Sequence, residues 1–186
     1  EVGQNMREHL IYTVQFRLRG DYSQNKEYSG WRMVKNALRY LFKKDGLLAC
    51  PAYDLTAFAA TQDGAERADA QLVVAPITMD LTKWEGFDKG IPLEEEPGMS
   101  ILGYGLRPQS KGYLKIKSTE PGIGYEVVHN HLTDERDRRL AIGIARYIRK
   151  FAEQSALKDY VGHEIVPGIE FSSDDELLEA YNMMGG

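Results

Sequence analysis

The chain has 186 residues, 42% of them hydrophobic and 27% charged, with a formal net charge of −5 at pH 7, so it has room for one large or two small domains around a real core. The acidic balance excludes a generally basic nucleic-acid-binding protein, because affinity for phosphates needs a cationic surface. The single cysteine, Cys50, excludes an intrachain disulfide framework and favours a reducing, cytoplasmic compartment, and no apolar run reaches the ~20 residues of a membrane-spanning helix.

The first part of the chain predicts a strand followed by a helix. Between residues 11 and 19 apolar and polar side chains alternate, which is typical of a strand with one buried face. From residue 31 to 44 the period becomes helical, and Gly46 is a suitable stop. The apolar stripe of this helix consists of Trp31, Val34, Leu38, Leu41 and Phe42, opposite Lys35, Arg39 and Lys43.

The middle of the chain predicts further strands. Residues 52–61 and 71–79 are strand candidates, and Pro76 within the second suggests an edge strand or a bulge because proline lacks a ladder donor. Residues 84–98 indicate a long loop of the kind that forms lids or pocket walls. Two more strand candidates, residues 99–106 and 113–117, flank a segment of turn composition.

The last third predicts two helices. The stronger one runs from about residue 134 to 154, and either Thr133 or Asp134 can cap it. The other, about residues 174–182, begins with a capping box at Ser173. Strands separated by loops, with few helices, predict an α+β fold in which helices pack on one face of an antiparallel sheet.

Local motifs for chemistry are sparse. The sequence contains neither G-x-G-x-x-G nor G-x-x-x-x-G-K-[ST], and glycines of strand ends and turns account for the G-x-G fragments at residues 103–105 and 122–124. On a strand, His129 and His131 would share a face and could chelate a metal, as in a metal-dependent HNH nuclease. A turn that leads into the following helix is the favoured interpretation. The alternating charges of residues 134–139 indicate a solvated helix face.

An acidic residue follows an aromatic one at Tyr53 and Asp54. A ring face attracts a cation and a carboxylate neutralises it, so the two residue types together suit a cationic ligand. Neighbouring side chains on a strand point to opposite faces, however, and this favours an ordinary polar strand residue.

Three segments together resemble one family. Residues 2–9, VGQNMREH, resemble the V-G-x-N-L-x-D-H segment of glucose–methanol–choline (GMC) flavin oxidoreductases. Residues 106–116, LRPQSKGYLKI, resemble their R-P-x-S-R-G hairpin, and residues 131–137, HLTDERD, resemble their Y-L-x-D-x-x-D start of a long helix. The order and placement agree, and residues 167–181 continue the pattern.

The resemblance implies the substrate-binding domain of a choline dehydrogenase-like enzyme cut from a longer chain. Residues 1–10 would be the exit from a missing FAD-binding domain. Residues 11–186 would be the substrate-binding domain, truncated before the segment with the catalytic His, which is expected just after Gly186, so that no catalytic residue lies in this chain. The implied reaction is oxidation of the CH–OH group of a small alcohol by hydride transfer to FAD, for which the fragment alone is expected to be inactive.

The resemblance also implies site residues and partners. Tyr53 and Asp54 fall where choline-oxidising members place an aromatic–acidic pair toward a cationic substrate, which implies that they bind the substrate. Asn5 and His9 lie where the chain leaves the flavin domain, which implies that they contact FAD. The implied partners are the FAD-binding domain and the alcohol, without nucleic acid, metal or membrane span. The alternative is a stand-alone, non-catalytic module with the same sheet that binds a small molecule or a protein.

Overall fold

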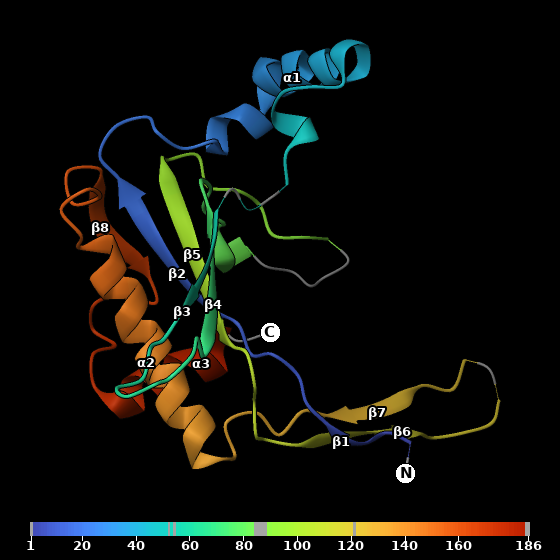
Figure 1. Ribbon diagram of the computed structural model, residues 1–186. Coiled ribbons are helices and arrows are strands. Elements are labelled where there is room, and N and C mark those ends of the chain that lie inside the picture. Colours follow the sequence, from blue (N-terminus) through green and yellow to red (C-terminus); the bar gives the residue numbers. More distant parts are fainter. Residues whose placement is uncertain (1, 52, 54, 84–88, 121, 185–186) are drawn as a thin grey trace.

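A computed structural model gives the fold and describes residues 2–51, 53, 55–83, 89–120 and 122–184. Its strands and helices alternate irregularly along the chain (Figure 1). The strands are β1 (Gln4–Met6), β2 (Tyr12–Leu18), β3 (Leu55–Ala59), β4 (Ala70–Ala75), β5 (Gly98–Gly105), β6 (Gly112–Ile116), β7 (Tyr125–Val128) and β8 (Val161–Val166). The helices are α1 (Gly30–Lys43), α2 (Glu135–Ala152) and α3 (Asp174–Met184), with short 3₁₀ turns η1 (Asn25–Tyr28), η2 (Leu47–Ala49) and η3 (Leu81–Lys83).

A five-stranded antiparallel sheet forms the body, with the strand order β3-β4-β5-β2-β8. Helices α2 and α3, orange and red in Figure 1, pack on one face of it. The alternation in β2 directs Tyr12, Val14 and Phe16 into this interface, where all three are buried. The α+β class predicted from the sequence, with helices on one face of an antiparallel sheet, is therefore confirmed.

Two glycines of β5 lie directly under the side chains of α2. A Cβ atom at Gly103 would lie 2.6 Å from Ile144 Cγ2, and one at Gly105 would lie 2.7 Å from Leu140 Cδ2. The first G-x-G fragment thus has a packing role, because a Cβ atom at either position would force the facing side chains of α2 to shift. The side chains that α2 contributes to this contact include the small, buried ones of Ala141 and Ala145.

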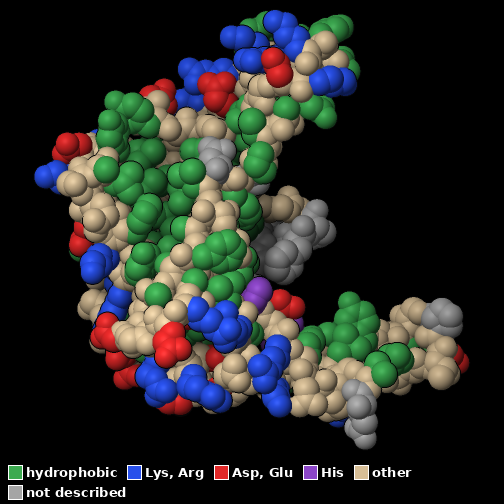
Figure 2. All heavy atoms as spheres, viewed as in Figure 1, with side chains coloured by type: hydrophobic (Ala, Val, Ile, Leu, Met, Phe, Trp, Pro, Cys, Tyr) green, Lys and Arg blue, Asp and Glu red, His purple; other side chains and the backbone are tan. Residues whose placement is uncertain are grey.

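Two parts project from the body. Strands β1, β6 and β7 form a second, three-stranded antiparallel sheet that extends as an arm, and α1 stands at the opposite end of the large sheet (Figure 1). Figure 2 shows the surface hollowed between these two projections. The uncovered face of the large sheet lies at the back of this hollow (Figure 1).

Two local expectations are wrong. The strands predicted on either side of residues 107–112 do not form a hairpin, because β5 pairs with β2 and β4 in the large sheet whereas β6 pairs with β1 and β7 in the arm. The strand with Pro76 is neither an edge nor bulged there, since β4 is an inner strand that ends at Ala75. The proline simply follows the strand end, where no ladder donor is needed.

The helix starts follow the predicted capping chemistry. Asp134 rather than Thr133 caps α2, and its carboxylate accepts from the Arg136 N–H at 2.8 Å. At α3 the Ser173 N–H donates to Glu176 Oε2 (2.8 Å) and the Glu176 N–H donates to Ser173 Oγ (3.3 Å), which is the reciprocal capping box. Each arrangement satisfies backbone donors that the helix itself leaves unpaired.

Candidate functional site

The candidate site is the face of the large sheet that α2 and α3 leave open. Register fixes which side chains share it, since side chains alternate along each strand. Thr13 of β2 lies opposite Leu102 of β5, which lies opposite Val73 of β4. The next row carries Tyr104, Gln71 and Phe58 from β5, β4 and β3. The rows combine apolar and aromatic groups with neutral polar ones and contain no charged side chain.

One end of this face is closed by the segment after β4. The Gln15 side-chain amide donates to the Met79 carbonyl (3.0 Å) and accepts from the Met79 N–H (2.6 Å). Ser100 Oγ donates to the Ile77 carbonyl at 2.6 Å. Both Gln15 and Ser100 are fully buried, so their hydrogen bonds offset the cost of removing them from water.

A buried amide fastens the same segment a second time. Asn25 Nδ2 donates to the carbonyls of Thr78 (3.0 Å) and Glu94 (2.8 Å), and Asn25 Oδ1 accepts from the Thr78 N–H (3.1 Å). At the rim, Arg17 forms ion pairs with Glu94 and Glu96, both at 3.1 Å. This end of the face is therefore a fixed wall made by chain segments far apart in sequence.

The other end of the face carries three aromatic rings. His9 stacks on Tyr104 with ring centroids 4.6 Å apart and planes inclined by 30°. In the same row as Tyr104, Phe58 leaves 63% of its surface exposed. Exposed rings on a rigid sheet suit contact with a planar or apolar ligand, or with a second domain.

The predicted site residues do not form one cluster. His9 lies at the aromatic end of the open face, but Asn5 lies on β1 in the arm, exposed and with φ of 57°. Tyr53 is 43% exposed between η2 and β3, and Asp54 lies outside the described residues, so their pairing is not tested. Tyr104, Phe58 and Gln15 were not predicted as site residues, because only strand pairing places them together.

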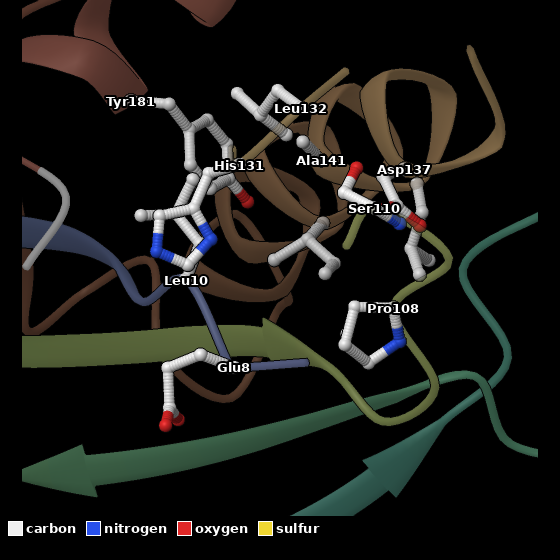
Figure 3. Close-up of a pocket in the computed structure, with 12 residues that line it drawn as sticks. Glu8, Leu10, Pro108, Ser110, His131, Leu132, Asp137, Ala141 and Tyr181 are labelled. Carbon is white, nitrogen blue, oxygen red and sulfur yellow. The ribbon is translucent and has the colours of Figure 1, made fainter. Parts of the chain in front are cut away.

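The three segments that carry the family resemblance meet at one small cavity of about 40 Å³ (Figure 3). Asp137 is buried beside it and joins the second and third of these segments. Its carboxylate accepts from the Gln109 N–H (2.9 Å) and the Ser110 N–H (2.6 Å), while Ser110 Oγ accepts from the Asp134 N–H (3.1 Å). The Glu8 carboxylate points away from the cavity. These motif residues hold the arm, β5 and the start of α2 in place.

The two histidines of the H-N-H string lie at the edge of this joint. Their rings stack nearly parallel, 5.0 Å apart at 12°, and burial together with the neighbouring His129 lowers the pKa of His131. Parallel rings do not converge their nitrogens on one ion. Within the described part of the chain, no group of three or more His, Cys, Asp or Glu side chains is placed to hold a metal.

Among the described residues, no helix combines the length and the apolar composition that a span across a bilayer requires.

Curated proteins similar to this chain are oxygen-dependent choline dehydrogenases. That of Staphylococcus saprophyticus is 26% identical over 178 residues, which is 96% of this chain and 30% of that protein. Those of Klebsiella pneumoniae and Escherichia coli K12 are 26% and 25% identical, again over 96% of this chain, and 31% of each relative is covered. The chain thus spans about a third of their length. No family model matches the sequence.

Solved structures show the same fold. Formate oxidase matches with a TM-score of 0.83 at 16% identity, over 100% of this chain and 36% of that one. Pyridoxine 4-oxidase from Mesorbium loti matches with a TM-score of 0.67 at 15% identity, over 96% of this chain and 30% of that one. Together with the choline dehydrogenase homologues, these neighbours confirm the resemblance to GMC oxidoreductases.

Proposed function

We propose that the chain forms the substrate-binding side of an FAD-dependent oxidoreductase that oxidises the CH–OH group of an alcohol. The observation that carries the proposal is the similarity to choline dehydrogenases along 96% of this chain. Bound FAD would accept a hydride from the alcohol carbon, while a base takes the hydroxyl proton. The contribution of this chain is to orient the alcohol and to exclude water from it.

The residues of the chain fit the ring end of FAD and not its phosphate end. The sequence has no glycine-rich phosphate loop, and the open face offers neutral and aromatic side chains such as Tyr104 and Phe58. We therefore assign the FAD-binding domain and the catalytic His to other parts of a longer protein. In this proposal residues 1–10 lead out of that domain and residues 11–186 form the substrate-binding domain.

Within this assignment the open face is the wall of the substrate cavity. His9, stacked on Tyr104, belongs to the segment that leads out of the flavin domain, and it is a proposed contact of FAD at the edge of this wall. Tyr53 and Asp54 remain proposed contacts for a cationic alcohol, and Asn5 a proposed neighbour of FAD. The rigid network around Gln15 fixes the shape of the wall, as a preorganised site requires.

The adjoining coding sequence gives the first test. An in-frame G-x-G-x-x-G before residue 1 and a His-containing segment after residue 186 are expected. The protein encoded by the whole frame should then bind flavin and oxidise alcohols. If the 186-residue chain, purified alone, carried stoichiometric flavin and oxidised alcohols, it would be wrong to assign FAD binding and the catalytic His to other parts of a longer protein.

Kinetics of the encoded protein test the wall itself. Phe58→Ala should raise KM for the alcohol at unchanged flavin content, whereas Ile169→Ala should leave KM unchanged. Ile169 is a matched control because it is 77% exposed beyond β8, next to Arg149 of α2 and not on the open face.

Asp54→Ala should raise KM for a cationic alcohol only, and an equal effect on neutral alcohols would contradict charge recognition. A stand-alone binding module, the rival hypothesis, requires that no flavin-binding sequence adjoins the chain.

A further inference from the structure

Helix α1 is an amphipathic helix whose apolar side has no partner in the described structure. None of its residues is buried, and it packs mainly against the short turns η1 and η2. Met33 and Asn36 are the half-buried residues of the helix, and Asn36 Nδ2 donates to the Glu27 carbonyl (3.1 Å). The side of the helix with Met33 and Asn36 therefore attaches α1 to the body, and the side with Trp31 faces away from that attachment.

The free side carries a continuous apolar strip. Trp31 and Phe42 are 76% and 78% exposed, at opposite ends of the helix. Eleven residues of α-helix rise about 16 Å and return to within about 20° of the starting direction, so the two rings project almost in line. Between them lie the exposed side chains of Val34, Leu38 and Leu41.

Cations border this strip on one side. At 100° per residue, Lys35, Arg39, Arg32 and Lys43 follow one another directly beside Trp31 and Phe42, and α1 contains no acidic residue. Residues 26–45 carry a net charge of +4 within a chain of net −5. Figure 2 shows Lys and Arg side chains gathered over α1 next to hydrophobic ones. Arg32 and Arg39 pair with Glu27 and Asp45, but Lys35 makes no ion pair with a described residue.

We propose that α1 docks the protein on an anionic lipid surface, with its axis in the plane of the membrane. An apolar strip with Trp, Leu and Phe, edged by Lys and Arg, is the pattern of helices that lie at bilayer interfaces. Aromatic rings at both ends suit the headgroup region, and anionic lipids complement the local positive charge. A second copy of the same helix is a poor occupant, because its own net positive charge would repel the first.

Vesicle sedimentation tests the proposal with the protein encoded by the whole reading frame, and with the 186-residue chain beside it. Both should bind vesicles of phosphatidylcholine mixed with phosphatidylserine, roughly 7:3, more tightly than phosphatidylcholine alone, and added salt should weaken binding because it screens the charges. In the 186-residue chain with Trp84→Phe as background, Trp31 is the sole tryptophan, and its emission should shift to shorter wavelength with the mixed vesicles. Absence of binding, or binding indifferent to lipid charge, would overturn the proposal.

Matched variants separate docking through α1 from nonspecific adsorption of the protein to vesicles. Lys35→Gln should weaken binding to the mixed vesicles about fivefold, the effect of one cation near an anionic surface. Trp31→Ala should weaken it about tenfold, from the apolar area lost. The controls are Lys117→Gln and Ile116→Ala on the arm, where Ile116 is 78% exposed, and neither should change binding.

Two outcomes would contradict a lipid-docking role of α1. One is an equal loss of vesicle binding in the α1 variants and the arm variants. The other is a Trp31→Ala protein that keeps its vesicle affinity but changes its oligomeric state in size-exclusion chromatography, which would assign the strip to contact between copies.

Discussion

Replacement of Asp137 should destabilise the fold more than any exposed substitution. The residue is 9% exposed, and its carboxylate accepts from two backbone N–H groups, of Gln109 and Ser110, at 2.9 and 2.6 Å. Hydrogen bonds to a charged group contribute about 1.5–3 kcal/mol each, and buried donors left unpaired cost about 1–3 kcal/mol each. Asp137→Ala should therefore lower the free energy of unfolding by about 3–5 kcal/mol, a large fraction of the total for a domain.

Urea unfolding followed by circular dichroism measures this loss. Asp137→Asn should lower the free energy of unfolding by about 2–4 kcal/mol. The NH2 group of asparagine is a donor, and it would face a backbone N–H from which the carboxylate oxygen accepts. Asp175→Asn is the matched control, since Asp175 lies exposed in the first turn of α3, and it should cost less than about 0.5 kcal/mol. If the free energy of unfolding of Asp137→Ala stayed within about 1 kcal/mol of the wild type at equal m-value, the hydrogen bonds of Asp137 would not be what joins α2 to the segment before β6.

Three further predictions concern the core and the helix start. Tyr12→Phe should leave the free energy of unfolding unchanged or raise it by about 1 kcal/mol in urea titrations, because the buried hydroxyl has no hydrogen-bond partner among the described residues and burial raises its pKa to about 12. Arg149→Ala should cost about 3–5 kcal/mol in the same titrations, because it strands the carboxylate of Glu164, whose side chain is 4% exposed, 2.8 Å away. Hydrogen bonds, first from the Ser173 N–H, lower the pKa of Glu176 to about 2, so its stabilisation is present above its unfolded pKa near 4.5 and lost as pH falls toward 2. The stability difference between wild type and Glu176→Gln should accordingly shrink over that interval in acid titrations.

The larger sheet could be predicted from the sequence where hydrophobic alternation was strong. Residues 11–19 indicated β2 because one side of that strand packs on helices. The helical spacing of apolar residues after residue 134 indicated α2. Strands β1, β7 and β8 were not predicted. They are three to six residues long and are defined by distant partners rather than by their own composition.

The candidate site was harder to predict for a related physical reason. In β2, Gln15 alternates with buried apolar residues and was assigned to the exposed side, yet it is fully buried because the segment through Met79 covers it. Tyr104 and Phe58 gave no local signal at all, since they become neighbours only through the register of β3, β4 and β5. A sequence pattern reports the period of a strand but not which distant segment lies over its second face.

The residues that carried the family resemblance explain why the fold follows from it more directly than the chemistry. Asp137 and Ser110 join α2 to the chain between β5 and β6. Both act on backbone placement, because Asp137 accepts from the N–H groups of Gln109 and Ser110 and Ser110 Oγ accepts from the Asp134 N–H. The motifs therefore preserve the frame, while Phe58, outside them, can change with the alcohol to be bound. Substrate preference should respond to substitution at Phe58 without loss of fold, whereas substitution at Asp137 should reduce stability first.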